Sequence, residues 1–296
     1  MTEQSIFERG VSKVKGVVSD LSIEQRDFSK AFIAMCSDGY ARGWHESNGG
    51  NLSYRLSAEE LQSCRSYFNE VPGQWVPLGI RAEGLQSECL MISASGGVFR
   101  TIEKAGSKSL GIIEISSEGD AWRAVWGFKG GGWPSSELRS HFMIHAVRKA
   151  ISGGADRVVY HTHPENVIAL STILPADTKQ YTQIIWRCLT ESILMAPSGV
   201  GVGQWRAPGS AELAEETATL MEKHLAVIWP HHGLLCAGTN LDAAFGLTHT
   251  IDKAAGIYLK ARSAVKNEEA LQMASEENVR AAAQAFGVSL DETFLG

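Results

Sequence analysis

The chain has 296 residues, of which 44% are hydrophobic and 20% are charged, values typical of a soluble globular protein. Its formal net charge of −6 excludes the basic excess that marks most nucleic-acid-binding proteins. No apolar run approaches the roughly 20 residues needed for a membrane-spanning helix, so neither nucleic acid nor membrane is an expected partner.

The cysteines and the N-terminal segment predict a cytoplasmic protein. The five cysteines are scattered and include no CxxC pair, which indicates reduced thiols rather than a disulfide framework or a cysteine zinc site. Residues 1–20 are mixed polar and lack the apolar segment of a signal peptide.

The first half of the chain predicts one helix followed by several strands. Ser22 and Gln25 fit an S-x-x-Q capping box, and apolar residues at helical spacing extend this helix to about Gly43. Residues 57–88 are polar and irregular, with a short helix starting at Ser57. Alternating or buried apolar runs predict strands at 52–56, 89–92, 110–115 and 121–126, the last two as a hairpin.

Helices and strands alternate irregularly in the second half. Helices are predicted from Ser135 or Ser136 to about 151, from about 166, and at 177–189, 210–224, 240–266 and 268–286. Strands are predicted at 157–161, 193–196 and 226–229. Neighbouring strands placed for hairpins favour one α/β domain over residues 1–296, with a central, mixed and mainly antiparallel sheet flanked by helices.

Histidines follow two of the predicted strands. His161 and His163 stand two apart at a strand exit, so their imidazoles face the same way and can hold one metal ion. His231 and His232 follow the strand at 226–229, and one of them could supply a third nitrogen ligand. Three neutral nitrogens leave an open coordination position, as in catalytic zinc sites, although isolated histidines at sheet edges are also common.

Other polar residues could complete such a site. Glu137 at the start of a predicted helix could act as a general base, or could simply be favoured there by the helix dipole. Small polar loops at 48–51, 93–97 and 135–136 could offer donors to a phosphate, although each alone is also ordinary turn chemistry.

The remaining histidines have weaker signals. His141 and His145 form an HxxxH pair on one helical face, without the HExxH context of a metalloprotease, and rank below His161 and His163 as ligands. His45, just after the first predicted helix, is expected to be exposed to solvent.

Taken together, these motifs resemble the class II aldolase/adducin family. The similarity runs from about Phe28 to Phe286, and a tryptophan-rich frame resembles more specifically one bacterial group of ketose 1-phosphate aldolases within the family. The matching stretches are 43–52, Trp126-Gly127, 134–138, Trp186, Thr190-Glu191 and 229–233.

The resemblance implies a zinc-dependent aldolase acting on a small sugar phosphate. It implies one Zn²⁺ per subunit held by His161, His163 and His232, with Glu137 as acid/base. It further implies Glu191 as a second acid/base that reaches the site of a neighbouring subunit, within a homotetramer with sites near the interfaces. The implied phosphate and substrate contacts are Asn48, Asn51, Ser95, Gly96, Ser135 and Ser136.

Three alternatives compete with this interpretation. A lysine Schiff base could hold the electrons released on cleavage, but no lysine occupies a recognisable strand-end site. Another aldolase, a 4-epimerase or a dehydratase acting on sugar phosphates would use the same metal triad on the same scaffold. A non-catalytic adducin-like interaction module is disfavoured because it should lack the three histidines.

Overall fold

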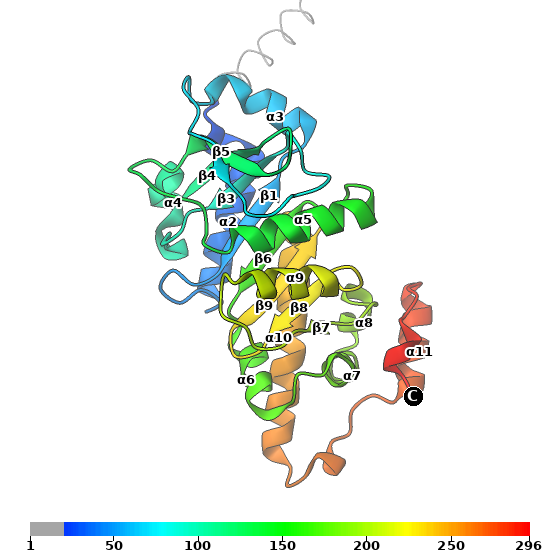
Figure 1. The fold of residues 1–296 in the computed structure, drawn as a ribbon. Helices are drawn as coiled ribbons and strands as arrows, with labels where there is room; N and C mark the ends of the chain where they lie inside the picture. The colour runs from blue at the N-terminus through cyan, green and yellow to red at the C-terminus, as the bar shows by residue number, and fades with distance from the viewer. Residues whose placement is uncertain (1–20) are drawn as a thin grey trace, which may run out of the picture.

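Nine strands form one sheet within residues 21–296, the part of the chain that the computed structural model describes (Figure 1). The spatial order is β2-β5-β4-β3-β1-β6-β9-β8-β7, and every neighbouring pair is antiparallel except β7 and β8. The predicted mixed, mainly antiparallel sheet is therefore confirmed. The strands are β1 (Asn51–Arg55), β2 (Val76–Pro77), β3 (Cys89–Ser93), β4 (Leu110–Ile115), β5 (Ala121–Gly127), β6 (Val158–Thr162), β7 (Gly201–Val202), β8 (Ala226–Trp229) and β9 (Gly233–Gly238).

Helices cover both faces of the sheet, with α5 and α9 on one face and α2 and α10 on the other (Figure 1). None of the helices in the described residues is long and apolar enough to cross a bilayer. The helices are α2 (Asp27–Ala41), α3 (Ala58–Cys64), α4 (Ile102–Ala105), α5 (Leu138–Ser152), α6 (Glu165–Ile173), α7 (Thr178–Cys188), α8 (Glu191–Met195), α9 (Ala211–Leu220), α10 (Leu241–Ala264) and α11 (Glu276–Phe286).

Side-chain alternation along β6 assigns each residue to one of these two layers. Val159 packs with Ile144 of α5, whereas Tyr160 packs with Phe32 of α2 on the opposite face. Because successive side chains on a strand point to opposite faces, His161 lies on the same face as Val159, toward α5. The apolar core on both sides of β6 thus fixes the direction in which the first predicted metal ligand points.

Three predicted elements differ from the structure. The predicted strand at 193–196 is wrong, because Glu191–Met195 form α8; so short an apolar run does not distinguish strand from helix. The predicted helix at 268–286 is a 3₁₀ turn at Glu268–Ala270 followed by α11, which Ser275 caps. The capping box at Ser22 exists, but it caps a 3₁₀ turn.

Two further points concern the N-terminal part of the chain. The first helix, α2, begins only at Asp27, because Arg26 has an extended backbone with ψ of 148°. The inference that no signal peptide is present concerns residues 1–20, which lie outside the described residues.

Candidate metal centre and active site

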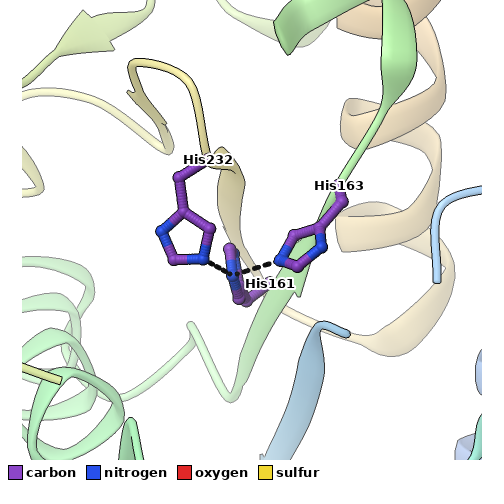
Figure 2. Close-up of side chains that lie close together, drawn as sticks. All are labelled: His161, His163 and His232. Atoms are coloured by element: carbon purple, nitrogen blue, oxygen red, sulfur yellow. Dashed lines mark hydrogen bonds between the residues drawn. The ribbon is translucent and has the colours of Figure 1, made fainter. Parts of the chain in front are cut away.

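Three imidazoles converge where β6 ends and the β8–β9 turn passes beside it (Figure 2). The Nε2 atom of His161 lies 3.2 Å from Nε2 of His163 and 3.3 Å from Nε2 of His232. One nitrogen from each of the three residues lies within 4.8 Å of the others. Two nitrogens bound to tetrahedral zinc at about 2.0–2.1 Å stand roughly 3.4 Å apart, so this donor set fits a zinc ion.

The turn between β8 and β9 determines which of its two histidines joins the group. His231 has a left-handed backbone, with φ of 59°, and its N–H donates to Ser171 Oγ at 2.8 Å. The His231 ring also lies by Ser171, with Nδ1 3.4 Å from Oγ. His232 instead directs its Nε2 to His161. The geometry therefore favours His232 over His231 as the third ligand.

Gly233 is required next to the histidines because there is no room for a side chain. A Cβ atom at this position would collide with the carbonyl oxygen of Thr162. It would also lie 3.0 Å from ring carbons of His161 and His163. The glycine therefore lets β9 approach β6 closely enough for the turn to bring His232 to the other two rings.

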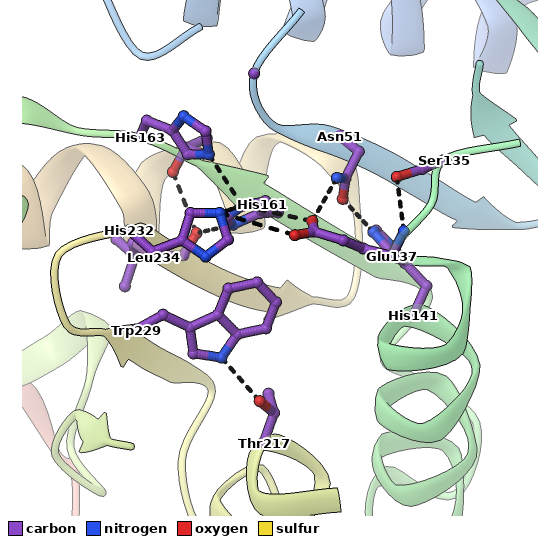
Figure 3. A network of polar contacts seen from close by, with 12 residues as sticks. Asn51, Ser135, Glu137, His141, His161, His163, Thr217, Trp229, His232 and Leu234 are labelled. Atoms are coloured by element: carbon purple, nitrogen blue, oxygen red, sulfur yellow. Dashed lines mark hydrogen bonds and ion pairs between the residues drawn. The ribbon is translucent and has the colours of Figure 1, made fainter. Parts of the chain in front are cut away.

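The second ring nitrogens of His161 and His163 are held by acceptors. His161 Nδ1 donates to the carbonyl oxygen of Leu234 at 3.2 Å (Figure 3). His163 Nδ1 donates to Glu46 Oε1 at 2.6 Å. These contacts place the proton on Nδ1 and leave the Nε2 lone pair free for a metal. Glu46 is a functional candidate that the sequence did not identify, since only its place in a loop near Asn48 distinguishes it from other surface glutamates.

An aromatic wall completes the metal side of the site. The Trp229 ring stacks on His232 with centroids 5.1 Å apart, and its Nε1 donates to Thr217 at 2.8 Å (Figure 3). Burial is the main reason why the pKa of His161 is held well below its ordinary value and why that of His232 is lowered to about 4. Both rings are therefore neutral near pH 7, which is the form that binds metal.

Glu137 faces the three histidines from the start of α5 (Figure 3). Its two carboxylate oxygens lie 3.5 Å from His161 Nε2 and 3.8 Å from His232 Nε2. Asn51 Nδ2 donates to the same carboxylate at 2.7 Å. Burial raises the pKa of Glu137, and the bond from Asn51 opposes this rise. A buried carboxylate beside a metal site has the position and the basicity of a general acid/base.

The start of α5 is one or two residues later than predicted. The helix begins at Leu138, and Glu137 is the N-cap residue without a side-chain capping bond. Ser135 Oγ instead accepts a hydrogen bond from the Glu137 backbone N–H at 3.2 Å. The Glu137 side chain is therefore free to turn toward the histidines instead of capping the helix.

A pocket of about 150 Å³ joins Glu137 and the histidines to the small polar loops. No lysine or arginine of the described chain is among the residues that line it, so an anionic group would meet neutral donors and any bound metal. All six predicted phosphate and substrate contacts line this pocket: Asn48, Asn51, Ser95, Gly96, Ser135 and Ser136.

Glu191 does not line this pocket within one chain. It is the first residue of α8 and is exposed. Within one chain the structure therefore does not bring Glu191 together with Glu137 and the histidines.

Three histidines outside the group of potential metal ligands, His45, His141 and His145, are buried. His45, expected to be exposed, is buried and lies 2.7 Å from the Tyr160 hydroxyl, so that prediction is wrong. His141 and His145 are also buried, and both contact Ser53 Oγ. They belong to no group of potential metal ligands in the described part of the chain.

The chain is similar to known proteins over most of its length. Residues 30–259 match the family described as Class II Aldolase and Adducin N-terminal domain. The chain is 37% identical over 268 residues to rhamnulose-1-phosphate aldolase of Pectobacterium carotovorum subsp. carotovorum, covering 90% of this chain and 96% of that protein. It is also 37% identical over 262 residues to rhamnulose-1-phosphate aldolase of Yersinia pestis, covering 88% and 94%.

A solved structure shares the architecture. The sugar-phosphate aldolase from Thermotoga maritima superimposes with a TM-score of 0.67 and 25% sequence identity. The match covers 80% of this chain and 95% of that chain.

Proposed function

The chain belongs to the class II aldolase and adducin family, and on this premise we propose that it reversibly cleaves L-rhamnulose 1-phosphate into dihydroxyacetone phosphate and L-lactaldehyde. The observation that carries the proposal is the convergence of three imidazole Nε2 atoms and the buried Glu137 carboxylate on one polar pocket. The relatives' names and the tryptophan-rich frame support this ketose phosphate over others.

His161, His163 and His232 would hold one zinc ion per subunit. Zinc bound by three neutral nitrogens supplies a Lewis acid that polarises a carbonyl oxygen and stabilises negative charge next to it. The roles of Glu46 and the Leu234 carbonyl are then to keep two of the rings oriented, with the lone pairs directed at the ion.

Glu137 would move the proton at the carbon that separates the two products. Cleavage breaks the bond between C3 and C4, and the C4 hydroxyl loses its proton as the aldehyde forms. In the cleavage direction Glu137 enters the step protonated, gives its proton to C3 to form dihydroxyacetone phosphate, and is left ionised. In the synthetic direction the ionised carboxylate removes that same proton. The neutral donors of the pocket loops would anchor the phosphate and so position the reacting carbons.

In a homotetramer, Glu191 would take up the C4 hydroxyl proton of the substrate that is bound in a neighbouring subunit. Its exposed position at the start of α8 is compatible with that role, because the side chain is available to a second copy. We further propose that the chain acts as one catalytic domain in the cytoplasm.

The test is an assay of purified, zinc-loaded protein with L-rhamnulose 1-phosphate beside L-fuculose 1-phosphate. We expect release of dihydroxyacetone phosphate from the rhamnulose ester at a higher kcat/KM, loss of activity with a chelator and recovery with added zinc. Preferred cleavage of L-fuculose 1-phosphate would mean that this ester, and not L-rhamnulose 1-phosphate, is the substrate. Epimerised or dehydrated products without dihydroxyacetone phosphate would refute the aldolase reaction.

A further inference from the structure

A row of buried polar side chains leads from Glu137 into the space between β1 and α5. Asn51 and Ser53 come from β1, and His141 and His145 come from α5; none is more than 6% exposed. Of these five residues, the reaction proposed above uses only Asn51 and Glu137. Buried polar side chains are costly unless they are hydrogen-bonded, so the arrangement of the other three requires an explanation.

The strand β1 and the helix α5 bring these side chains together because the distance between successive side chains on one face is similar in the two elements. Residues two apart on a strand are about 6.7 Å apart and share a face. Residues four apart on a helix are about 6 Å apart along its axis and also share a face. Glu137, His141 and His145 therefore form a ladder that runs beside Asn51 and Ser53.

The hydrogen bonds alternate between the side chains of β1 and those of α5. Asn51 Nδ2 donates to Glu137 Oε2 at 2.7 Å, and Asn51 Oδ1 contacts His141 Nε2 (Figure 3). Ser53 Oγ lies 2.6 Å from His141 Nδ1 and 2.8 Å from His145 Nε2. Both ring nitrogens of His141 are therefore engaged, which leaves no lone pair of this residue for a metal.

The charge of Glu137 gives this chain of bonds a direction. An ionised carboxylate only accepts, so Asn51 must present its NH₂ group to Glu137 and its oxygen to His141. His141 Nε2 must then carry the proton, and its Nδ1 accepts from the Ser53 hydroxyl. Ser53 in turn accepts from His145 Nε2. Burial, which lowers the pKa of His141 to about 3, keeps this ring neutral, with one donor and one acceptor.

We propose that His141 and Ser53 are positioning residues of the reaction, which hold the Asn51 amide with its nitrogen toward Glu137 and so fix that carboxylate beside the histidine triad. This inference rests on the proposed aldolase function. Without a donor at His141 Nε2, the amide loses one of the two contacts that distinguish its ends, and its oxygen can turn toward the carboxylate and displace it. Without the Ser53 hydroxyl, His141 Nδ1 loses its donor, and only the Asn51 oxygen still favours the proton on Nε2.

The experiment compares removal with conservative replacement in zinc-loaded protein. Ser53→Ala and His141→Phe remove the hydrogen bonds, whereas Ser53→Thr keeps the hydroxyl and His141→Gln keeps a donor near Nε2. Ser140→Ala is the matched control, because Ser140 is a buried serine of α5 whose Oγ has no hydrogen-bond partner in the described chain.

We expect kcat to fall about 10- to 100-fold in Ser53→Ala and His141→Phe, since a small misplacement of a catalytic group costs rate at this scale. KM should stay within about 2-fold and zinc should remain stoichiometric. Ser53→Thr and His141→Gln should recover most of the rate, and Ser140→Ala should match the unmodified protein. Unchanged kcat, an equal loss in Ser140→Ala, loss of zinc, or no recovery in the conservative variants would overturn the proposal.

A measurement that needs no substrate separates this proposal from the assignment of the reaction. In zinc-loaded protein labelled with ¹⁵N-histidine, His141 should show the Nε2-protonated tautomer, identified by the signals missing from His141→Gln. A proton on Nδ1 would overturn the proposal, even if other variants fail to fold. If the unmodified protein releases no dihydroxyacetone phosphate, the proposed function fails while the tautomer still decides the hydrogen-bond order.

Discussion

Replacing Glu46 should weaken zinc binding, because its carboxylate accepts the Nδ1–H of His163 at 2.6 Å. Partners of this kind typically contribute 10- to 100-fold in metal affinity. The Glu46 side chain is 68% exposed, so water screens its charge and the effect should lie at the lower end. For Glu46→Ala we expect about a 10-fold weaker affinity, which corresponds to about 1.4 kcal/mol.

The smaller change Glu46→Gln separates the role of the hydrogen bond from that of the charge. Glutamine keeps an oxygen that accepts from His163, so its zinc affinity should fall between those of the unmodified protein and Glu46→Ala. The assay is a competition titration against a chelating dye at pH 7, with kcat measured at saturating zinc. Glu118→Ala, which removes an exposed glutamate from the β4–β5 turn, is the control.

Two results would refute the reasoning about Glu46. An unchanged affinity in Glu46→Ala would show that the contact to His163 does not orient the ring. A loss of affinity in Glu118→Ala of the same size would show that the effect comes from the net charge of the surface.

The variant Glu137→Gln should bind zinc normally and keep its KM, but its kcat should fall by about 10²- to 10⁴-fold. The amide fits the same space but cannot take up the proton. Zinc analysis and steady-state kinetics check this. Gly233→Ala should destabilise the fold by about 1–3 kcal/mol and lose zinc, because its Cβ would collide with the Thr162 carbonyl; denaturant titration and metal analysis decide. In chelator-treated protein, His141 should lower the free energy of unfolding by about 1.4 kcal/mol for each pH unit between pH 6 and pH 4. The reason is that burial keeps this ring neutral in the folded protein, whereas in the unfolded chain it becomes protonated below about pH 6.5. His141→Gln should remove that part of the slope, and an unchanged slope would contradict the assigned pKa.

Much of the sheet follows from local sequence patterns, and the missed parts have physical reasons. The apolar runs before His161 and His231 predicted β6 and β8, because buried strands require them. The strand β9 was not predicted, since its hairpin turn contains Pro230 and two histidines rather than a typical turn pair. The strand predicted at 193–196 failed because packing against α7 and α11, and not periodicity, stabilises α8.

The candidate site was predictable where residue chemistry is distinctive and unpredictable where it depends on neighbours. His161, His163 and His232 stand out in the sequence, and the structure brings their nitrogens together. Glu46 resembles many surface glutamates, and only its distance to His163 reveals it. Ser53 gave no signal, and His141 stood out only as part of an HxxxH pair that suggested a metal ligand. Their actual arrangement depends on how α5 lies on β1, which no local pattern states.

The register between β1 and β6 connects the metal centre to the acid/base. Asn51 pairs with His161 across these strands, so both side chains leave the sheet on the α5 side. On the opposite face, Leu52 and Tyr54 are buried in the core formed with α2. A slip of one residue would exchange these faces, placing Asn51 and Ser53 in an apolar core and separating Glu137 from its donor. The burial of Leu52 and Tyr54 thus also sets the geometry of the reaction, since it holds the Asn51 amide where His141 and Glu137 can share it.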